Sequence, residues 1–218
     1  DMQRLSRACR ERGVLLCVDA IQSLGAVPFD LAETPADFVV ADGHKWMLGP
    51  EGLGLFYVNP AIRDALRLTQ FGWAMCANPG DFSQKTWRPA ASARRFECGS
   101  PNMLGIHALH ASMGVLQEVG MQEVEAMLQR NVQTLFDLVG SIERVRIVTP
   151  REAQRRAGIF SFSVEGVESD RLWKALMEAR VVCASRGGYL RFSPHFYTRQ
   201  GVLERAVDIL QDLINDFN

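Results

Sequence analysis

A lysine in a glycine-rich turn is the first candidate for chemistry in this sequence. Lys45 follows a short apolar run, residues 37–41, and precedes a second one, residues 53–58. Short β-branched runs bounded by Gly and Pro are typical of buried strands. A lysine on the turn that leaves such a strand lies at the carboxyl edge of a sheet, where α/β folds place ligand sites, and burial there makes the amine nucleophilic. A surface lysine in a glycine-rich loop fits this stretch, taken alone, equally well.

Three further polar side chains accompany this lysine. Asp19 ends an earlier apolar run at residues 14–18, Gln22 follows three positions later, and His44 directly precedes the lysine. If the two strands are parallel neighbours, their ends meet at one sheet edge and the four side chains lie together. Pyridoxal phosphate needs such a set, with a lysine for the Schiff base and a carboxylate for the pyridinium nitrogen. Gln22 then contacts the phenolic oxygen and His44 the phosphate, although Asp19 alone is more often a turn or capping residue.

Four motifs, in order along the chain, resemble the class V aminotransferase family. They are V-D-A-I-Q at 18–22, D-G-H-K-W-M-L-G-P-E-G at 42–52, R-F-E-C-G-S-P-N at 95–102 and L-R-F-S-P-H-F-Y at 190–197. The resemblance covers essentially the whole chain and implies the fold type I pyridoxal-phosphate architecture. The family includes cysteine desulfurases, selenocysteine lyases, isopenicillin N epimerase-like proteins and several aminotransferases.

The resemblance also implies roles for single residues. Lys45 is the Schiff-base lysine, and Asp19 is the partner of the pyridinium nitrogen. Ser100 stands where the family usually has a threonine, whose hydroxyl reaches the cofactor phosphate of the neighbouring subunit, so a homodimer is implied. Arg191 matches the arginine that holds the substrate α-carboxylate, a task that suits a bidentate guanidinium.

Two positions depart from the family pattern. Asp42 stands where many relatives have a serine that contacts the phosphate, and a carboxylate there repels phosphate unless it is paired or turned away. Family desulfurases carry a nucleophilic cysteine on a mobile loop shortly before the carboxylate-binding arginine. Here that region is short, and Cys183 lies in a strand-like run, where a packed thiol is the expected state. This disfavours a persulfide-forming role.

Composition excludes several other classes. The 218 residues carry a net charge of -1, which favours neither nucleic acid nor an anionic membrane as a partner. No apolar run approaches the roughly 20 residues that cross a bilayer. The five cysteines are scattered without C-x-x-C spacing, which indicates a reducing, cytoplasmic compartment rather than disulfides or zinc. His107 and His110 have a spacing compatible with a metal, but no third ligand is evident, so we expect none.

The elements that must position these residues alternate between strands and helices. This rhythm predicts an α/β fold with a mainly parallel sheet, part of a fold type I large domain, followed by a small α+β domain. In the first part we expect strands at 14–18, 37–41 and 53–58, helices at 5–12, 59–69 and 104–119, and an irregular stretch at 70–101. In the second part we expect helices at 122–139, 169–180 and 200–217, and strands at 145–148, 158–164, 181–184 and 189–193. Ser169 should cap the second of these helices, the strand at 158–164 alternates apolar and polar residues, and residues 185–188 should form a tight turn.

We place the domain boundary near Gly120, with residues 1–120 as the C-terminal portion of the cofactor-binding domain and 121–218 as the small domain. The sequence starts with Asp1-Met2 and runs directly into a helical pattern. We therefore expect that it begins inside a larger protein, and that residues 1–218 alone are inactive and poorly soluble.

The sequence predicts a pyridoxal-phosphate enzyme that acts on a small α-amino acid through Lys45, as an aminotransferase or a related lyase. Cysteine desulfurase, selenocysteine lyase or epimerase-like activity is the first alternative. A non-catalytic relative that serves as a dimerisation or binding module is the second.

Overall fold

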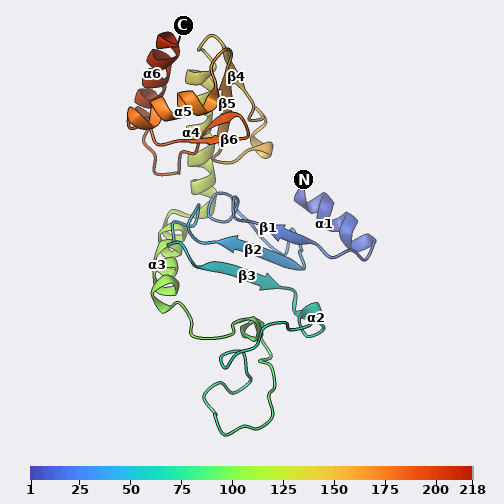
Figure 1. Ribbon diagram of the computed structural model, residues 1–218. Coiled ribbons are helices and arrows are strands. Elements are labelled where there is room, and N and C mark those ends of the chain that lie inside the picture. The colour runs from blue at the N-terminus through green and yellow to red at the C-terminus, as the bar shows by residue number, and fades with distance from the viewer. Residues whose placement is uncertain (218) are drawn as a thin grey trace. The chain divides into compact units, whose positions relative to one another are not determined.

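The computed structural model describes residues 1–217 and divides into two compact units, Asp1–Glu118 and Val119–Asn218, which are treated separately below. The first unit contains a three-stranded sheet and flanking helices (Figure 1). Its elements are α1 (Met2–Glu11), β1 (Cys17–Asp19), β2 (Phe38–Asp42), β3 (Gly54–Val58), α2 (Pro60–Arg63), the 3-10 helix η1 (Ala93–Phe96) and α3 (Met103–Val119).

The sheet has the order β1-β2-β3, with β1 and β2 parallel and β2 and β3 antiparallel. The prediction of a mainly parallel sheet is therefore wrong for the second of the two strand pairs. Only residues 43–53 connect β2 to β3. A parallel neighbour needs a crossover of a dozen or more residues, usually through a helix, so this short connection returns the chain antiparallel.

Asp37 holds the start of the sheet together. Its Oδ2 accepts from the backbone N of Leu16 at 2.8 Å, and its Oδ1 accepts from Asn59 Nδ2 at 3.3 Å. The residue before β2 thus fixes both the chain entering β1 and the chain leaving β3. Because the backbone N of Leu16 is bonded to this side chain, the strand is shorter than the predicted 14–18. Val14 and Leu15 are exposed, and strand pairing begins at Cys17.

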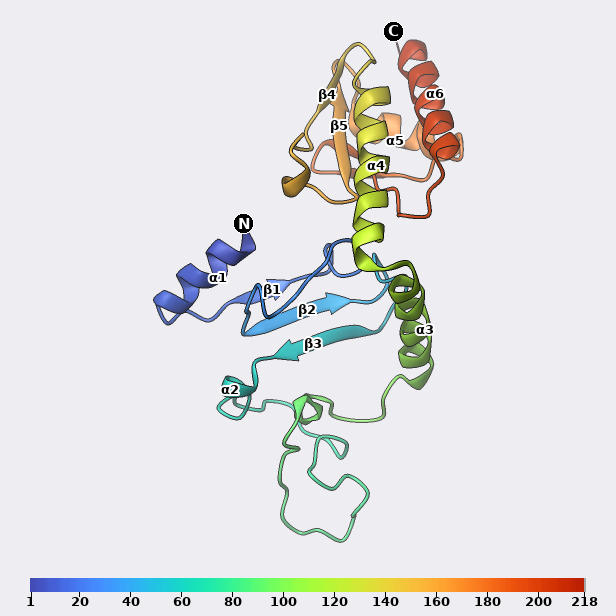
Figure 2. The same ribbon diagram turned by 180° about the vertical axis from the view of Figure 1, so that it is seen from behind.

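The predicted helix at 59–69 is also corrected. Only Pro60–Arg63 is helical, with the Asn59 side chain accepting from the N of Ala61 and proline in the first turn. The remaining residues are turns and extended chain that lead into the irregular stretch, which is observed as expected apart from η1. This stretch loops away from the sheet in both views (Figures 1 and 2).

Helix α3 has nearly the predicted bounds. Four of the apolar or small residues whose spacing indicated this helix, Leu104, Ala108, Ala111 and Val115, are exposed, and the buried residues are Gly105, Leu109 and Leu116. Both faces of α3 are apolar, so periodicity alone could not choose between them.

The second unit is an α+β domain with a four-stranded sheet and the helices α4, α5 and α6 (Figure 2). Its elements are α4 (Met121–Val139), β4 (Val145–Ile147), the 3-10 helix η2 (Ala153–Arg155), β5 (Phe160–Val164), α5 (Ser169–Glu178), β6 (Ala184–Arg186), β7 (Tyr189–Phe192) and α6 (Gln200–Asp216). The strand order is β4-β5-β7-β6, and all pairs are antiparallel. The inward residues of β5 alternate as predicted, with Phe160 and Phe162 fully buried against α4, α5 and α6.

Two local predictions in this unit are corrected. Glu168, not Ser169, is the N-cap of α5, and the Ser169 hydroxyl donates instead to the carbonyl of Gly188 at 2.6 Å. Strand β6 begins at Ala184, three residues later than expected, so the turn to β7 is only Gly187-Gly188. Both glycines have positive φ, +59° and +82°, as a two-residue hairpin of this hand requires.

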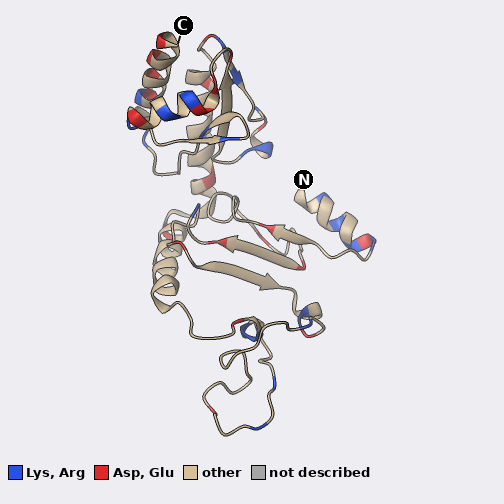
Figure 3. Cartoon of the chain, in the orientation of Figure 1, with Lys and Arg blue, Asp and Glu red and all other residues tan. Residues whose placement is uncertain are grey.

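Charged side chains are unevenly distributed along the chain (Figure 3). Helix α3 carries a single charged residue, Glu118, and β3 carries none. Within residues 1–217, no helix combines the length and the apolar character needed to span a bilayer.

Candidate functional site

Three predicted site residues, Gln22, His44 and Lys45, lie on two turns that contact each other, and Asp19 is the last residue of the strand that enters the first turn. The first turn, residues 20–26, leaves β1, and the second, residues 43–48, leaves β2. Trp46 Nε1 donates to Gln22 Oε1 at 2.9 Å, across 24 positions of sequence. Because β1 and β2 are parallel, this bond joins the turns at the carboxyl edge of the sheet, as the sequence predicted.

Glycine at position 25 permits this contact. Gly25 has φ +86°, and a Cβ there would overlap the carbonyl of Trp46 and lie 2.7 Å from the N of Met47. The backbones of the two turns therefore touch without an intervening side chain. Any larger residue at this position must separate the turns.

The indole also fixes the orientation of the Gln22 amide. An indole N–H can only donate, so the amide oxygen must face Trp46 and the amide NH₂ must face away from it. Trp46 is 5% exposed, which leaves its ring little freedom to turn. Gln22 thus presents a donor, suited to an oxygen acceptor such as the phenolic oxygen of a pyridoxal ring.

Helix α3 packs against the turn that carries Lys45. Leu109 lies so close to Gly43 and Gly49 that Cβ atoms there would come within 3.1 and 2.7 Å of its Cδ1. Gly49 N donates to the carbonyl of Gly43 at 2.9 Å and closes the turn around Lys45. The turn ends at Leu48, whose φ of 62° is uncommon for a residue with a side chain. Lys45, which is partly exposed, is therefore held on a defined backbone.

Asp42 and His44 form a pair on the same turn. His44 Nδ1 lies 2.7 Å from Asp42 Oδ1, and the backbone N of His44 donates to the same oxygen at 3.3 Å. The hydrogen bond from the His44 side chain is the main cause that lowers the pKa of the Asp42 carboxyl. Asp42 is therefore ionised at neutral pH and turned toward the imidazole.

Asp19 ends β1 on the same face of the sheet as Asp42. Asp19 pairs in register with Val40, and Asp42 lies two residues further along β2, so both point to one side. Asp19 is exposed, and its Oδ1 accepts from the N of Ile21 at 3.0 Å. Its Oδ2 makes no hydrogen bond within residues 1–217 and is open to a cationic partner such as a pyridinium N–H.

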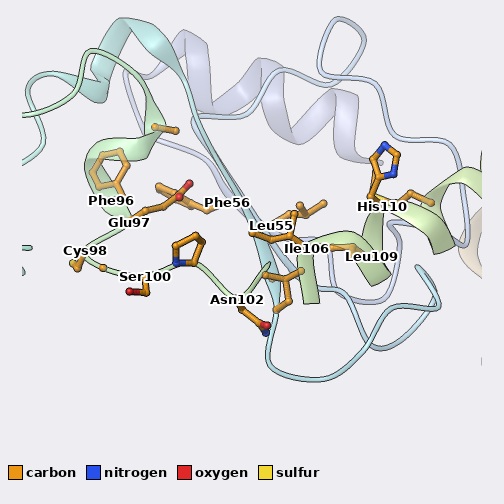
Figure 4. Close-up of a pocket in the computed structure, with 16 residues that line it drawn as sticks. Leu55, Phe56, Phe96, Glu97, Cys98, Ser100, Asn102, Ile106, Leu109 and His110 are labelled. Atoms are coloured by element: carbon orange, nitrogen blue, oxygen red, sulfur yellow. The ribbon is translucent and has the colours of Figure 1, made fainter. Parts of the chain in front are cut away.

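Ser100 lies at a different place in this unit. It lines a cavity of about 610 Å³ between β3, η1 and α3, together with Phe56, Phe96, Ile106 and Leu109 (Figure 4). None of Asp19, Gln22, His44 and Lys45 lines this cavity. The structure therefore does not bring Ser100 to the lysine turn within the chain, and the cavity is not the predicted cofactor site.

Arg191 belongs to the second unit. It lies on β7 between Leu190 and Phe192, which are buried in the helical core, so its side chain leaves the opposite face of the sheet. Its Nε is buried and has no hydrogen-bond partner among the described residues. An unsatisfied guanidinium nitrogen costs free energy, and a bound carboxylate is the kind of group that offsets the cost.

Cys183 lies just before β6 and packs against the core of the second unit. Burial raises the pKa of its thiol to about 11. The thiolate is the nucleophilic form, so a thiol with this pKa is a poor nucleophile at neutral pH. This agrees with the expectation of a packed thiol.

Two residues of this arrangement were missed at the sequence level. Trp46 was counted as part of a motif without a role of its own, and Gly25 was not singled out. A buried indole needs a hydrogen-bond partner, so the placement of Trp46 beside the candidate lysine was a usable signal. Nothing in the sequence marked Gly25, because its role depends on a contact 21 positions away.

Comparison with known proteins finds relatives along nearly the whole chain. The family model described as aminotransferase class-V matches residues 1–191. A probable cysteine desulfurase of Pyrococcus abyssi is 25% identical over 227 residues, which cover 98% of this chain and 56% of that protein. Isopenicillin N epimerase of Streptomyces clavuligerus is 26% identical over 222 residues, with 97% and 56% covered. The chain thus spans a little over half the length of these relatives.

Solved structures share the fold. A mutant of C-DES, with glycine covalently linked to its PLP cofactor, matches with a TM-score of 0.87 at 22% identity, over 97% of this chain and 56% of that one. The family supports pyridoxal phosphate as the cofactor. The side chains at the sheet edge fit it: a carboxylate with a free oxygen, an amide oriented as a donor, an imidazole and a lysine amine. The chain belongs to the class-V aminotransferase family.

Proposed function

We propose that this chain carries the lysine-bearing part of a pyridoxal-phosphate enzyme that acts on a small α-amino acid. The observation that supports this most strongly is the joining of the two turns by the Gln22–Trp46 hydrogen bond and the close approach at Gly25. This contact supports a common site at one sheet edge for a lysine, a carboxylate, an amide donor and an imidazole. Pyridoxal phosphate uses a lysine for its Schiff base and a carboxylate for its pyridinium nitrogen.

Each side chain then has a separate task. Pyridoxal phosphate, when bound, supplies an electron sink for the substrate α-carbon. Lys45 would hold the cofactor covalently and, when its Nζ is free, would move the substrate α-proton. Asp19 would keep a proton on the ring nitrogen, and Gln22 would donate to the phenolic oxygen. Arg191 binds the substrate carboxylate through two parallel hydrogen bonds.

Transamination or a related lyase reaction is the outcome that we favour. Desulfuration requires a thiolate that accepts sulfur, and the raised pKa of Cys183 argues against this residue in that role. The names of relatives keep cysteine desulfurase and epimerase-like activity as the alternative, and the resemblance in sequence motifs adds selenocysteine lyase activity to it. A non-catalytic binding module remains the second alternative.

The proposal also covers the division into domains and the assembly of two copies. Residues 1–120 contribute the C-terminal portion of the cofactor-binding domain, and residues 121–218 form the small domain that carries Arg191. Ser100, exposed and apart from the lysine turn, donates its hydroxyl to the cofactor phosphate of a second copy in a cytoplasmic homodimer. A site shared between two copies would explain why Asp19, Gln22, His44 and Lys45 do not line the cavity around Ser100.

Cofactor uptake and product analysis test the proposal. The complete polypeptide that contains these residues should gain a visible absorbance band with pyridoxal phosphate. It should then be incubated with cysteine, selenocysteine, or alanine plus a keto-acid acceptor, with sulfide, selenide and new amino acid assayed separately. We expect a new amino acid rather than sulfide. A polypeptide that takes up no cofactor would favour the binding module.

A further inference from the structure

The Asp42–His44 pair has a chemical consequence for anion binding at the lysine turn. Asp42 Oδ1 accepts from both the backbone N and the Nδ1 of His44. An ionised carboxylate can only accept hydrogen bonds, so Nδ1 must carry a proton. Nε2 is therefore the atom through which His44 meets a ligand.

An anionic ligand determines the state of that second nitrogen. Toward a phosphate oxygen, Nε2 must donate, and a ring with protons on both nitrogens is an imidazolium. Asp42 then serves as the counter-ion of this cation and not as an isolated negative charge beside the phosphate. Its hydrogen bond also fixes the plane in which Nε2–H points.

Both side chains are positioned for such a role. Asp42 is the last residue of β2 and His44 lies two positions beyond it, so the pair is built on the sheet edge rather than on a mobile segment. The side chains of His44 and Asp42 are 30% and 38% exposed. A ligand can therefore reach the imidazole without any displacement of the carboxylate from it.

We propose that Asp42 is a positioning residue that holds His44 as a doubly protonated donor toward an anionic phosphate oxygen. This inference rests on the proposed function, because it assigns the phosphate to pyridoxal phosphate. The sequence led us to expect that a carboxylate at this position repels phosphate unless it is paired or turned away, and Asp42 is paired with His44. Here the carboxylate strengthens phosphate binding through the imidazole.

The test compares two ligands that differ only in the phosphate. The affinities of the cofactor-free complete polypeptide for pyridoxal phosphate and for pyridoxal are measured by titration of the absorbance. Asp42→Asn keeps an oxygen that can accept from Nδ1 but removes the charge. The difference between charged and neutral hydrogen bonds predicts a loss of about fivefold to tenfold for pyridoxal phosphate. The affinity for pyridoxal should change less than about twofold, since pyridoxal brings no anion to the imidazole.

Three further variants make the comparison specific. His44→Gln should weaken pyridoxal phosphate binding by a similar factor, and the double variant should lose no more than the weaker-binding single variant, because the two residues act as one unit. Asp30→Asn is the matched control. Asp30 also accepts a backbone hydrogen bond two positions ahead, from Ala32 at 2.7 Å, and should leave both affinities unchanged.

The possible outcomes separate this inference from the proposed function. Tighter binding of pyridoxal phosphate by Asp42→Asn would show that the carboxylate repels phosphate and would overturn the inference. Equal losses for both ligands would show a merely structural role and would also overturn it. A wild-type polypeptide that binds neither ligand would refute the proposed function itself.

Discussion

Replacement of Gly25 by alanine tests whether contact between the two turns builds the site. Gly25 has φ +86°, and its Cβ would overlap the Trp46 carbonyl. The left-handed conformation costs a residue with a side chain about 1–2 kcal/mol. Separation of two packed backbones adds about 1–3 kcal/mol. We therefore expect Gly25→Ala to lower the free energy of unfolding by about 2–5 kcal/mol and to weaken cofactor binding, because Gln22 moves away from Lys45.

Gly13→Ala is the matched control. Gly13 has a similar φ, +63°, but a Cβ there would meet nothing within 4 Å. Gly13→Ala should lower the free energy of unfolding only by the cost of the left-handed backbone conformation, about 1–2 kcal/mol. It should leave the cofactor affinity unchanged. Urea unfolding gives the free energies, and absorbance titration gives the affinities. If both alanine variants lose equal stability and bind cofactor equally well, the close approach of the turns does not build the site.

Three other substitutions probe single contacts. Trp46→Phe removes the donor to Gln22; we expect a loss of about 1 kcal/mol in stability and a shift of the visible band of the bound cofactor, measured by spectroscopy, as the amide reorients. Arg191→Lys replaces two parallel hydrogen bonds by one, so steady-state kinetics should show KM for the amino acid rising about tenfold, with a smaller change in kcat. Because burial raises the pKa of Cys183 from an ordinary 9.0 to about 11, its alkylation at pH 7, followed by mass spectrometry, should be about 100-fold slower than that of an ordinary thiol and should rise toward pH 11. The same shift favours the neutral thiol in the folded state, so its contribution to stability is complete below the ordinary thiol pKa and is lost as the pH rises toward 11.

The sequence predicted those parts of the fold whose signals are local. The long helices α4 and α6 have clear apolar stripes, and the turn Gly187-Gly188 follows from residues that accept positive φ. The parallel pairing of β1 and β2 agrees with the mainly parallel sheet that the alternation of strands and helices predicts. These signals sufficed to bring the lysine turn and the Asp19 turn to one edge.

The features that the sequence did not predict depend on contacts between residues far apart in the chain. The direction of β3 depends on a connection too short for a crossover. The buried face of α3 depends on Leu109 fitting against Gly43 and Gly49, and both faces of that helix are apolar in sequence. The state of Asp42 could not be predicted either, since only the structure shows its carboxylate bound to His44.

The apolar residues on the outer face of α3 bear on the expectation that residues 1–218 alone are poorly soluble. Leu104 is 84% exposed, and Val115 on the same face is 46% exposed. A helix that is apolar on all sides is normally buried on all sides. A monodisperse preparation of residues 1–218 that melts cooperatively would contradict this expectation.

The most direct test of the central claim is the identity of the lysine that holds the cofactor. The sequence contains only three lysines, Lys45, Lys85 and Lys174. Borohydride reduction of the cofactor-loaded complete polypeptide, followed by proteolysis and mass spectrometry, locates the pyridoxyl label. We expect the label on Lys45, its loss in Lys45→Ala, and no change in Lys85→Ala. A label on Lys85 or Lys174, or an undiminished visible band in Lys45→Ala, would contradict the account.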